Sequence, residues 1–321
     1  MKMAIIGAQG HYGFALEALQ LDPELHLEGV SRSRPGEELG GVATGAQKYG
    51  APVFEDYRVM LDAVQPDVAV VNPYFCDTAD VSMECLKRGI HVFSEKPLAT
   101  RLDRLDALEE TWRASGRALA GMFNLRYCGW FLTVKQAVAQ GLIGTVRAAS
   151  GRKSYKMGTR GPVYQRRETF GGILPWVAIH ALDWVLEIGG PVQWIAGTQD
   201  NRLNRGNGDM DTAGAILLKT ENGVIGTVTA DFYRPAGSAR HDDDRLMVTG
   251  TEGMLEALNG RVFLENDQPR RELPLVPGRQ CFMEMLKAIG TDDAREMGLS
   301  ALRVTRAALQ ARDGVYGRND L

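Results

Sequence analysis

Between residues 1 and 123, short apolar runs alternate with segments of helical spacing. The runs are apolar on both faces and too short for surface helices. The expected strands are Met3–Ile6, Leu25–Val30, Val68–Val71, Ile90–Phe93 and Ala118–Phe123. The expected helices between them are Phe14–Leu21, Thr78–Arg88 and Arg101–Ser115. Strands that are buried on both faces and separated by helices indicate a doubly wound parallel sheet of the α/β class.

The pattern changes after residue 123. One amphipathic helix, Phe131–Gln140, precedes strand-like segments that are joined by hairpin signals. Asn222-Gly223 follows AILLKT, and Asn259-Gly260 separates MLEAL from RVFL. Hairpin-linked strands form antiparallel sheets, and helical patterns return at Cys281–Ile289 and Ser300–Arg312. We therefore predict an α/β domain over residues 1–123 and an α+β domain over residues 124–321.

The composition limits the classes of function. The 321 residues suffice for two domains, and 37 basic against 40 acidic side chains give a net charge of −3. Proteins that bind nucleic acid usually carry a basic excess, so we expect no nucleic-acid partner. No uncharged apolar run reaches the roughly 18 residues of a membrane-spanning helix, so we expect no membrane partner. Four scattered cysteines show no metal-like spacing, so we expect no metal site and a cytoplasmic location.

A glycine-rich turn follows the first expected strand directly. Gly7 permits a tight turn, Gly10 lets the backbone approach a pyrophosphate, and Gly13 allows close packing of helix on strand. Unpaired N–H groups in the next helix's first turn favour phosphate. The alternative is a turn without a ligand, but the position after a strand predicts a dinucleotide site. The residues expected to line it are Gly7, Ala8, Gln9, Gly10, His11 and Tyr12.

The end of the second strand bears on the choice of cofactor. An NAD site usually places a carboxylate there to accept hydrogen bonds from the ribose 2′-OH. Here Ser31, Arg32, Ser33 and Arg34 follow the strand, with no carboxylate before Glu37. Guanidinium forks and hydroxyls suit a 2′-phosphate, so we expect NADP(H) to be preferred and NAD(H) to be possible. The alternative is a solvated loop with incidental arginines.

A lysine follows another strand end. Ile90–Phe93 leads into Glu95-Lys96-Pro97, and Pro97 restricts Lys96 to extended backbone. Residues past the carboxyl ends of such strands line the ligand crevice. Lys96 near a nicotinamide could polarise a substrate carbonyl. The alternative is a surface Glu–Lys pair, which contributes under about 1 kcal/mol.

These segments together resemble a known family. IIGAQGHYG, HVFSEKPLAT, GGILPWVAIHALDW and the turn Gly250–Gly253 are similar to the Gfo/Idh/MocA family (glucose–fructose oxidoreductase, inositol dehydrogenase and rhizopine catabolism proteins). The resemblance implies a Rossmann domain followed by an α/β domain with a large open, mostly antiparallel sheet. It also implies hydride transfer between NAD(P) and a sugar, polyol or related carbonyl compound. The open sheet implies a homo-dimer or homo-tetramer.

The resemblance also assigns catalytic residues. Lys96 matches the family's catalytic lysine, and His180 matches its catalytic histidine. Trp176, four residues before His180, stands where many members have aspartate, so the family's Asp–His relay is altered. Asp183 lies three residues beyond His180, so on a helix it could orient the imidazole. Trp176 is either a packing residue or an apolar wall of the substrate site.

Other candidate site residues follow from position. Asn72, Pro73 and Tyr74 end the third strand, where the family has a cofactor loop, and Glu95 precedes Lys96. Asn124 and Arg126 stand at the domain crossing. Their alternative roles are ordinary turns and helix caps.

A basic stretch, residues 151–168, interleaves Tyr155 and Arg160 with other cations. It suits an anionic sugar-like substrate or, equally, a solvated edge or subunit contact. Asp242-Asp243-Asp244 is expected to be a solvated turn. The chain is thus predicted to be an NAD(P)-dependent dehydrogenase or reductase acting on CH–OH groups. The alternatives are a nucleotide-binding sensor or scaffold without catalysis, motivated by Trp176, and an enzyme acting on a non-carbohydrate.

Overall fold

The computed structural model describes residues 1–317 and divides into two compact units. The first unit contains Met1–Met122 and Gln280–Leu302, and the second contains Phe123–Arg279 with the chain from Arg303 onward. The first crossing lies one residue from the predicted boundary. The return of Gln280–Leu302 to the first unit differs from the predicted domain 124–321, whose last four residues lie outside the described part.

The first unit is built on a parallel sheet with the strand order β3-β2-β1-β4-β5-β6. Its strands are β1 (Lys2–Ile6), β2 (His26–Ser31), β3 (Val53–Phe54), β4 (Val68–Val71), β5 (His91–Ser94) and β6 (Leu119–Gly121). Ile6 pairs with both Ser31 and Val71, so the carboxyl ends of three strands reach one edge. This order is that of a doubly wound dinucleotide-binding sheet, and the predicted Rossmann architecture is confirmed.

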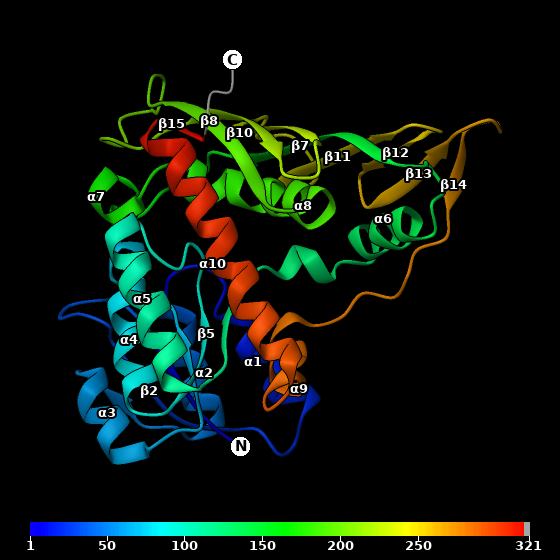
Figure 1. Ribbon diagram of the computed structural model, residues 1–321. Coiled ribbons are helices and arrows are strands. Elements are labelled where there is room, and N and C mark those ends of the chain that lie inside the picture. Colours follow the sequence, from blue (N-terminus) through cyan, green and yellow to red (C-terminus); the bar gives the residue numbers. More distant parts are fainter. Residues whose placement is uncertain (318–321) are drawn as a thin grey trace. The chain divides into compact units, whose positions relative to one another are not determined.

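Helices connect these strands (Figure 1). They are α1 (Gly13–Leu21), α2 (Gly40–Tyr49), α3 (Tyr57–Val64), η1 (Phe75–Asp77), α4 (Thr78–Lys87) and α5 (Leu102–Ser115), with α9 (Cys281–Ala288) and the start of α10 (Asp292–Asp313) from the returning segment. The ring of Phe282 packs 4.8 Å from that of Phe93. The returning segment therefore contributes to the core of the first unit.

The second unit holds a nine-stranded sheet with the order β14-β13-β12-β11-β7-β10-β9-β8-β15. Its strands are β7 (Val146–Lys156), β8 (Val192–Asp200), β9 (Ala213–Thr220), β10 (Ile225–Arg234), β11 (Asp242–Gly250), β12 (Met254–Leu258), β13 (Arg261–Glu265), β14 (Arg271–Leu273) and β15 (Val315–Gly317). Neighbouring strands are antiparallel except β7 and β10. The predicted open, mostly antiparallel sheet is confirmed.

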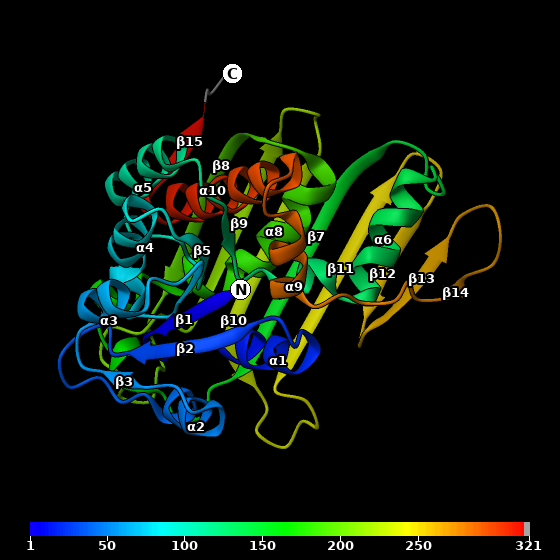
Figure 2. The same cartoon turned by 90° about the horizontal axis from the view of Figure 1, so that it is seen from below.

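One face of this sheet carries helices (Figure 2). The helical segments are η2 (Asn124–Tyr127), α6 (Gly129–Ala139), η3 (Pro162–Tyr164), α7 (Arg167–Phe170), η4 (Leu174–Ala178) and α8 (Ile179–Gly189). α8 packs so closely on β7 that a Cβ at Gly151 would lie 3.0 Å from the Cβ of Ala181. The opposite face carries exposed side chains, including Leu217 and Met247.

Two sequence expectations need comment here. Residues Asp242–Asp244 begin strand β11, so the predicted solvated turn is wrong. The helical stretch Arg167–Gly189 is long and apolar enough to cross a membrane, but 94% of its most apolar window is buried inside the protein. The central helix of a folded domain has the same properties, so the stretch is weak support for a membrane span.

Candidate active site

The glycine loop follows β1 and is held by the ends of two neighbouring strands. Gly7 donates its N–H to the carbonyl of Ser31 (2.8 Å), and Gln9 donates to the carbonyl of Asn72 (2.8 Å). Asn72 returns a hydrogen bond from Nδ2 to the Gln9 carbonyl (2.7 Å). Gly7 has φ +77°, and a Cβ on it would lie 2.3 Å from the Asn72 carbonyl oxygen. The loop therefore requires glycine at position 7, as predicted.

Glu95 is bound to the same loop. Its carboxylate, fully buried, accepts the His11 backbone N–H (2.5 Å) and lies 3.0 Å from His11 Nδ1. Burial alone would raise the pKa of Glu95, but His11 and Lys96 outweigh it and hold the pKa below its usual value. A Cβ on Gly10 would lie 2.0 Å from Glu95 Oε2. Gly10 is therefore needed for the approach of Glu95.

The third glycine differs from its prediction. A Cβ on Gly13 would meet no atom within 4 Å, so close packing of helix on strand does not require glycine there. Tyr12, before it, lies against α2, where a Cβ on Gly41 would be 2.5 Å from the Tyr12 hydroxyl.

The loop residues fit a dinucleotide. Within residues 1–317, the backbone N–H groups of Gly10 and Tyr12 have no hydrogen-bond acceptor, so both can bind a pyrophosphate at the start of α1. In the same described part, Oδ1 of the fully buried Asn72 has no hydrogen-bond partner. A buried acceptor without a donor is costly, so a bound group that donates there would be stabilising. Gly10, Tyr12 and Asn72 would hold the nucleotide.

The four residues after β2 are already engaged. The Ser31 hydroxyl donates to the carbonyl of Phe54 (3.1 Å). Arg32 pairs with Glu55 (2.8 Å). Arg34 pairs with Asp77 and lies over the ring of Tyr74, 4.2 Å from its centroid.

The sequence interpretation missed the carboxylate of Glu37, which lies in the same loop. This buried carboxylate accepts from the Ser33 N–H and hydroxyl (2.7 Å each) and from the N–H of Ala8 (3.2 Å). A signal was present, because Glu37 is the first acid after the strand, but its distance along the chain did not indicate that the loop folds back. The loop that follows β2 therefore contains a buried carboxylate beside the arginines that favour NADP(H).

Lys96 is fully buried directly after Glu95. Its peptide bond to Pro97 is cis, and its backbone N–H donates to Glu95 Oε1 (2.9 Å). Because Glu95 also binds His11, the lysine and the glycine loop belong to the same edge of the first sheet.

His180 lies in the second unit, at the start of α8. The single π-helical turn η4, which contains Trp176, leads directly into α8. Such turns are rare in proteins overall, but those that occur are often found at functional sites. The buried His180 ring meets the ring of Phe123 edge-on at 6.5 Å.

Asp183 has a strong partner other than the one predicted. Both carboxylate oxygens accept from Arg126, with Nε at 2.9 and 2.7 Å and a terminal nitrogen at 2.5 Å. Burial raises the pKa of Asp183 to about 6, against the opposing effect of Arg126. The predicted orientation of His180 by Asp183 stays a prediction, and these contacts count against it.

The weaker substrate candidates form an aromatic group in the second unit. The Trp176 ring meets that of Tyr164 edge-on at 6.0 Å, and the Arg160 guanidinium lies 5.4 Å from the Tyr164 ring centroid. Tyr155 stacks on His241 at 5.0 Å. Asn124 begins η2 and does not share these ring contacts.

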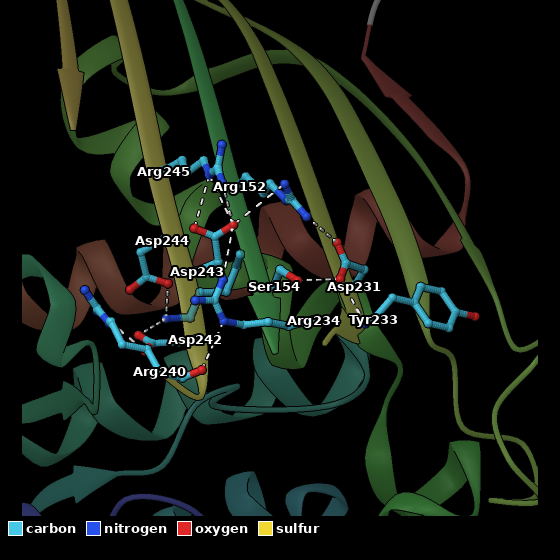
Figure 3. Close-up of polar contacts among 11 residues, drawn as sticks. Arg152, Ser154, Asp231, Tyr233, Arg234, Arg240, Asp242, Asp243, Asp244 and Arg245 are labelled. Atoms are coloured by element: carbon cyan, nitrogen blue, oxygen red, sulfur yellow. Dashed lines mark hydrogen bonds and ion pairs between the residues drawn. The ribbon is translucent and has the colours of Figure 1, made fainter. Parts of the chain in front are cut away.

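Most cations of the basic stretch have acidic partners. Arg152, Arg234 and Arg245 converge on Asp243, and Arg152 also reaches Asp231 (Figure 3). On the opposite side of β7, the buried Lys153 binds Asp244 (2.5 Å). Arg166 pairs with Glu168, and Arg167 with Asp211. The stretch is therefore mainly a set of ion pairs between strands and loops.

Comparison with known proteins bears on this arrangement. Residues 1–122 match the family model described as an oxidoreductase family with an NAD-binding Rossmann fold, and residues 131–256 match the GFO/IDH/MocA C-terminal domain. A solved Thermotoga maritima structure described as an oxidoreductase is 34% identical, with a TM-score of 0.90 over 97% of this chain and 96% of that one. The chain belongs to the Gfo/Idh/MocA oxidoreductase family. It is accordingly an NAD(P)-dependent oxidoreductase.

Curated family members are also similar. D-glucoside 3-dehydrogenase of Escherichia coli is 31% identical over 188 residues, which are 57% of this chain and 52% of that protein. The match thus spans about half the length of that relative. The oxidoreductase YrbE of Bacillus subtilis is 27% identical over 283 residues, 81% of this chain and 80% of that protein.

Proposed function

We propose that the protein transfers hydride between a nicotinamide cofactor and a carbonyl or hydroxyl carbon of a sugar, polyol or sugar acid. The observation that supports the proposal is that the buried Lys96 directly follows Glu95, whose carboxylate accepts the backbone N–H of His11 in the glycine loop. The name of the E. coli relative, D-glucoside 3-dehydrogenase, supports a sugar-like substrate.

Two residues of the chain carry the proton chemistry in this proposal. When bound, the nicotinamide supplies or accepts the hydride. The Lys96 ammonium polarises the substrate oxygen, and His180 takes or gives its proton. Asp183 pairs with Arg126, and its orientation of His180 stays a prediction.

The choice between NADP(H) and NAD(H) is a separate proposal. Arg32 and Arg34 favour NADP(H) by residue type, but Glu55 and Asp77 already pair with them. Glu37 adds a buried carboxylate to the same loop, which would repel a 2′-phosphate and could accept from a ribose hydroxyl. These contacts of Arg32, Arg34 and Glu37 favour NAD(H), which is the cofactor we propose. The preference for NADP(H) that the residue types predict stays an untested prediction.

Among the predicted substrate residues, only Arg160 supports the proposal that the substrate carries a negatively charged group. Its Nε is buried and has no hydrogen-bond partner among residues 1–317, and burial lowers its pKa. The guanidinium also lies 4.5 Å from the ring centroid of Phe232. A substrate carboxylate would supply the missing acceptor.

We also propose that the protein forms a homo-dimer or homo-tetramer through the open face of its large sheet. Leu217, Thr227, Ser150 and Met247 stand in one row across four strands, and the two apolar members are 47% and 43% exposed. Met247→Glu should shift the sedimentation coefficient to that of a smaller species. An unchanged coefficient for this variant and for Leu217→Glu would contradict the interface.

The test of the main proposal is turnover of NADH and NADPH with a panel of sugars, polyols, sugar acids and lactones. Lys96→Met should lower kcat at least a thousandfold with nearly unchanged cofactor affinity, because polarisation is lost while the glycine loop is intact. The exposed Lys87→Met is the matched control. Wild-type protein that binds cofactor but turns over no compound would favour the sensor hypothesis, which the comparisons do not support.

A further inference from the structure

A cavity of about 580 Å³ lies in the first unit, away from the glycine loop. His91, the first residue of β5, and Ala118, directly before β6, form part of its wall. The glycine loop and Lys96 follow the carboxyl ends of the same parallel sheet. Since amino ends and carboxyl ends lie at opposite edges of a parallel sheet, the cavity is distinct from the dinucleotide site.

The wall of this cavity is basic. It includes Arg113, Arg117, Arg295 and His91 and contains no aspartate or glutamate. Arg113 pairs with Glu109 on its own helix. Within residues 1–317, the guanidiniums of Arg117 and Arg295 form no ion pair. In a chain with a net charge of −3, two unpaired arginines facing one hollow favour an anion.

His91 adds a neutral donor. The Ala118 backbone N–H donates to His91 Nδ1 (2.9 Å), so the ring proton resides on Nε2. Burial lowers the pKa of His91, and the nearby Arg117 lowers it further. The imidazole is therefore neutral at pH 7, and its Nε2–H can donate to an oxygen.

The cavity is formed before any ligand binds. Trp112 Nε1 donates to the carbonyl of Arg117 (2.9 Å), which fixes the turn that carries this arginine. On the other side Trp112 packs on α10, where a Cβ on Gly298 would lie 2.5 Å from its Cζ2. The volume falls within the range of about 300–1,000 Å³ that small-molecule sites occupy.

From these contacts we propose that the cavity binds a phosphate group, free or carried by a small metabolite, between Arg117 and Arg295. Each guanidinium can donate two parallel hydrogen bonds to phosphate oxygens, and the His91 Nε2–H can supply another. Trp112, Ala118 and Ile289 supply apolar wall for the rest of an ester. β5 connects His91 to Ser94, directly before Glu95 and Lys96, so the ligand would bind at the far end of the strand that carries the lysine.

The test is isothermal titration of the full chain, saturated with NADH so that the glycine loop is filled, at constant ionic strength. The probes are inorganic phosphate and ribose 5-phosphate, with ribose as the neutral comparison. We expect saturable binding of at least one phosphate probe and none of ribose. Arg117→Gln, Arg295→Gln and the double variant should weaken binding roughly tenfold or more, because each loses a charged fork.

Arg101→Gln is the matched control, since Arg101 is an exposed arginine beside the same helix α5 and does not line the cavity. Tighter binding of ribose 5-phosphate than of phosphate would identify an ester, and equal binding would identify the free anion. Equal weakening in Arg101→Gln, or no saturable binding of either probe, would overturn the proposal. Unliganded turnover of the cavity variants should equal that of the wild type.

Discussion

Glu37 and Asp183 are buried carboxylates with very different partners. Within residues 1–317, Glu37 accepts hydrogen bonds from donors of its own loop and of the glycine loop, at Ser33, Ala8 and Gln9. Asp183 is held by a buried guanidinium, that of Arg126. The first is placed to act on cofactor choice, and the second on stability and its pH dependence.

Removal of the Glu37 charge tests the cofactor proposal. Glu37→Gln should raise the affinity for NADPH relative to NADH about tenfold, which corresponds to about 1.4 kcal/mol, because the repulsion of a 2′-phosphate is lost. Fluorescence titration with both cofactors measures the ratio. Glu38→Gln, an exposed neighbour with the same charge change, should leave it unaltered. A wild-type preference for NADPH would contradict the role given to Glu37.

Arg126→Met should lower the free energy of unfolding by about 3–5 kcal/mol at pH 7, because Asp183 is left as a buried carboxylate without its counter-ion. The pH dependence adds a second readout. The folded pKa of Asp183, about 6, lies above its ordinary value. The stabilisation from its protonation is therefore complete below the unfolded pKa and is lost as the pH rises through 6.

Wild-type protein should accordingly lose stability relative to Asp183→Asn between pH 4 and pH 7, measured by denaturant unfolding. The exposed Asp62→Asn provides the comparison. Parallel curves for wild type and Asp183→Asn would show that Asp183 does not titrate in this range. A changed pH–rate profile in Asp183→Asn would support an additional effect on His180, and an unchanged one would exclude it.

At the scale of elements, two glycines of the loop differ in whether a neighbouring group occupies the space that a side chain would take. Gly10→Ala should weaken cofactor binding at least tenfold, because φ is +69° and the new Cβ would displace the buried Glu95 carboxylate. Gly13→Ala should be neutral or slightly stabilising, since its Cβ would meet no atom within 4 Å at the start of a helix. Titration of both variants with NADH compares them. Equal effects at the two positions would contradict the contact with Glu95.

The same scale shows what the sequence could predict. Five strands of the first sheet, all except β3, and the hairpins at Asn222-Gly223 and Asn259-Gly260 follow from local pattern, and the structure contains them within a few residues. Helix α2 was missed because its sequence, GGVATGAQKY, has weak helix propensity and is ordered by tertiary packing.

Strand β11 shows a different limit. Its first three residues are acids, which predict a solvated turn. Their partners, including Lys153 and Arg152, come from distant parts of the chain. Likewise, residue types indicated Lys96, His180 and the glycine loop as candidates, but the partners of Asp183 and Glu37 depend on how loops fold and could not be read from spacing.

At the scale of the whole molecule, the first unit is assembled from two separate stretches of chain. Gln280 Nε2 donates to the carbonyl of Phe14 (2.6 Å), and Phe282 packs on Phe93. A fragment of residues 1–122 lacks both contacts and exposes apolar core, so it should melt at least 10 °C below the same fragment joined through a flexible linker to residues 280–302. Equal melting temperatures by circular dichroism would contradict the structural role of the returning segment.

This arrangement also affects how the protein is made. A ribosome releases β1 to β6 early, but α9 emerges only after strands β7 to β14 of the large sheet have been translated. The ring of Phe93 in the nascent Rossmann sheet therefore stays exposed until the segment 280–302 has been synthesised. Docking of that segment then closes a long loop, and the entropic cost of closure grows slowly with loop length. Because the first unit is completed by a segment that is synthesised late, we expect the nascent chain to depend on chaperones during translation.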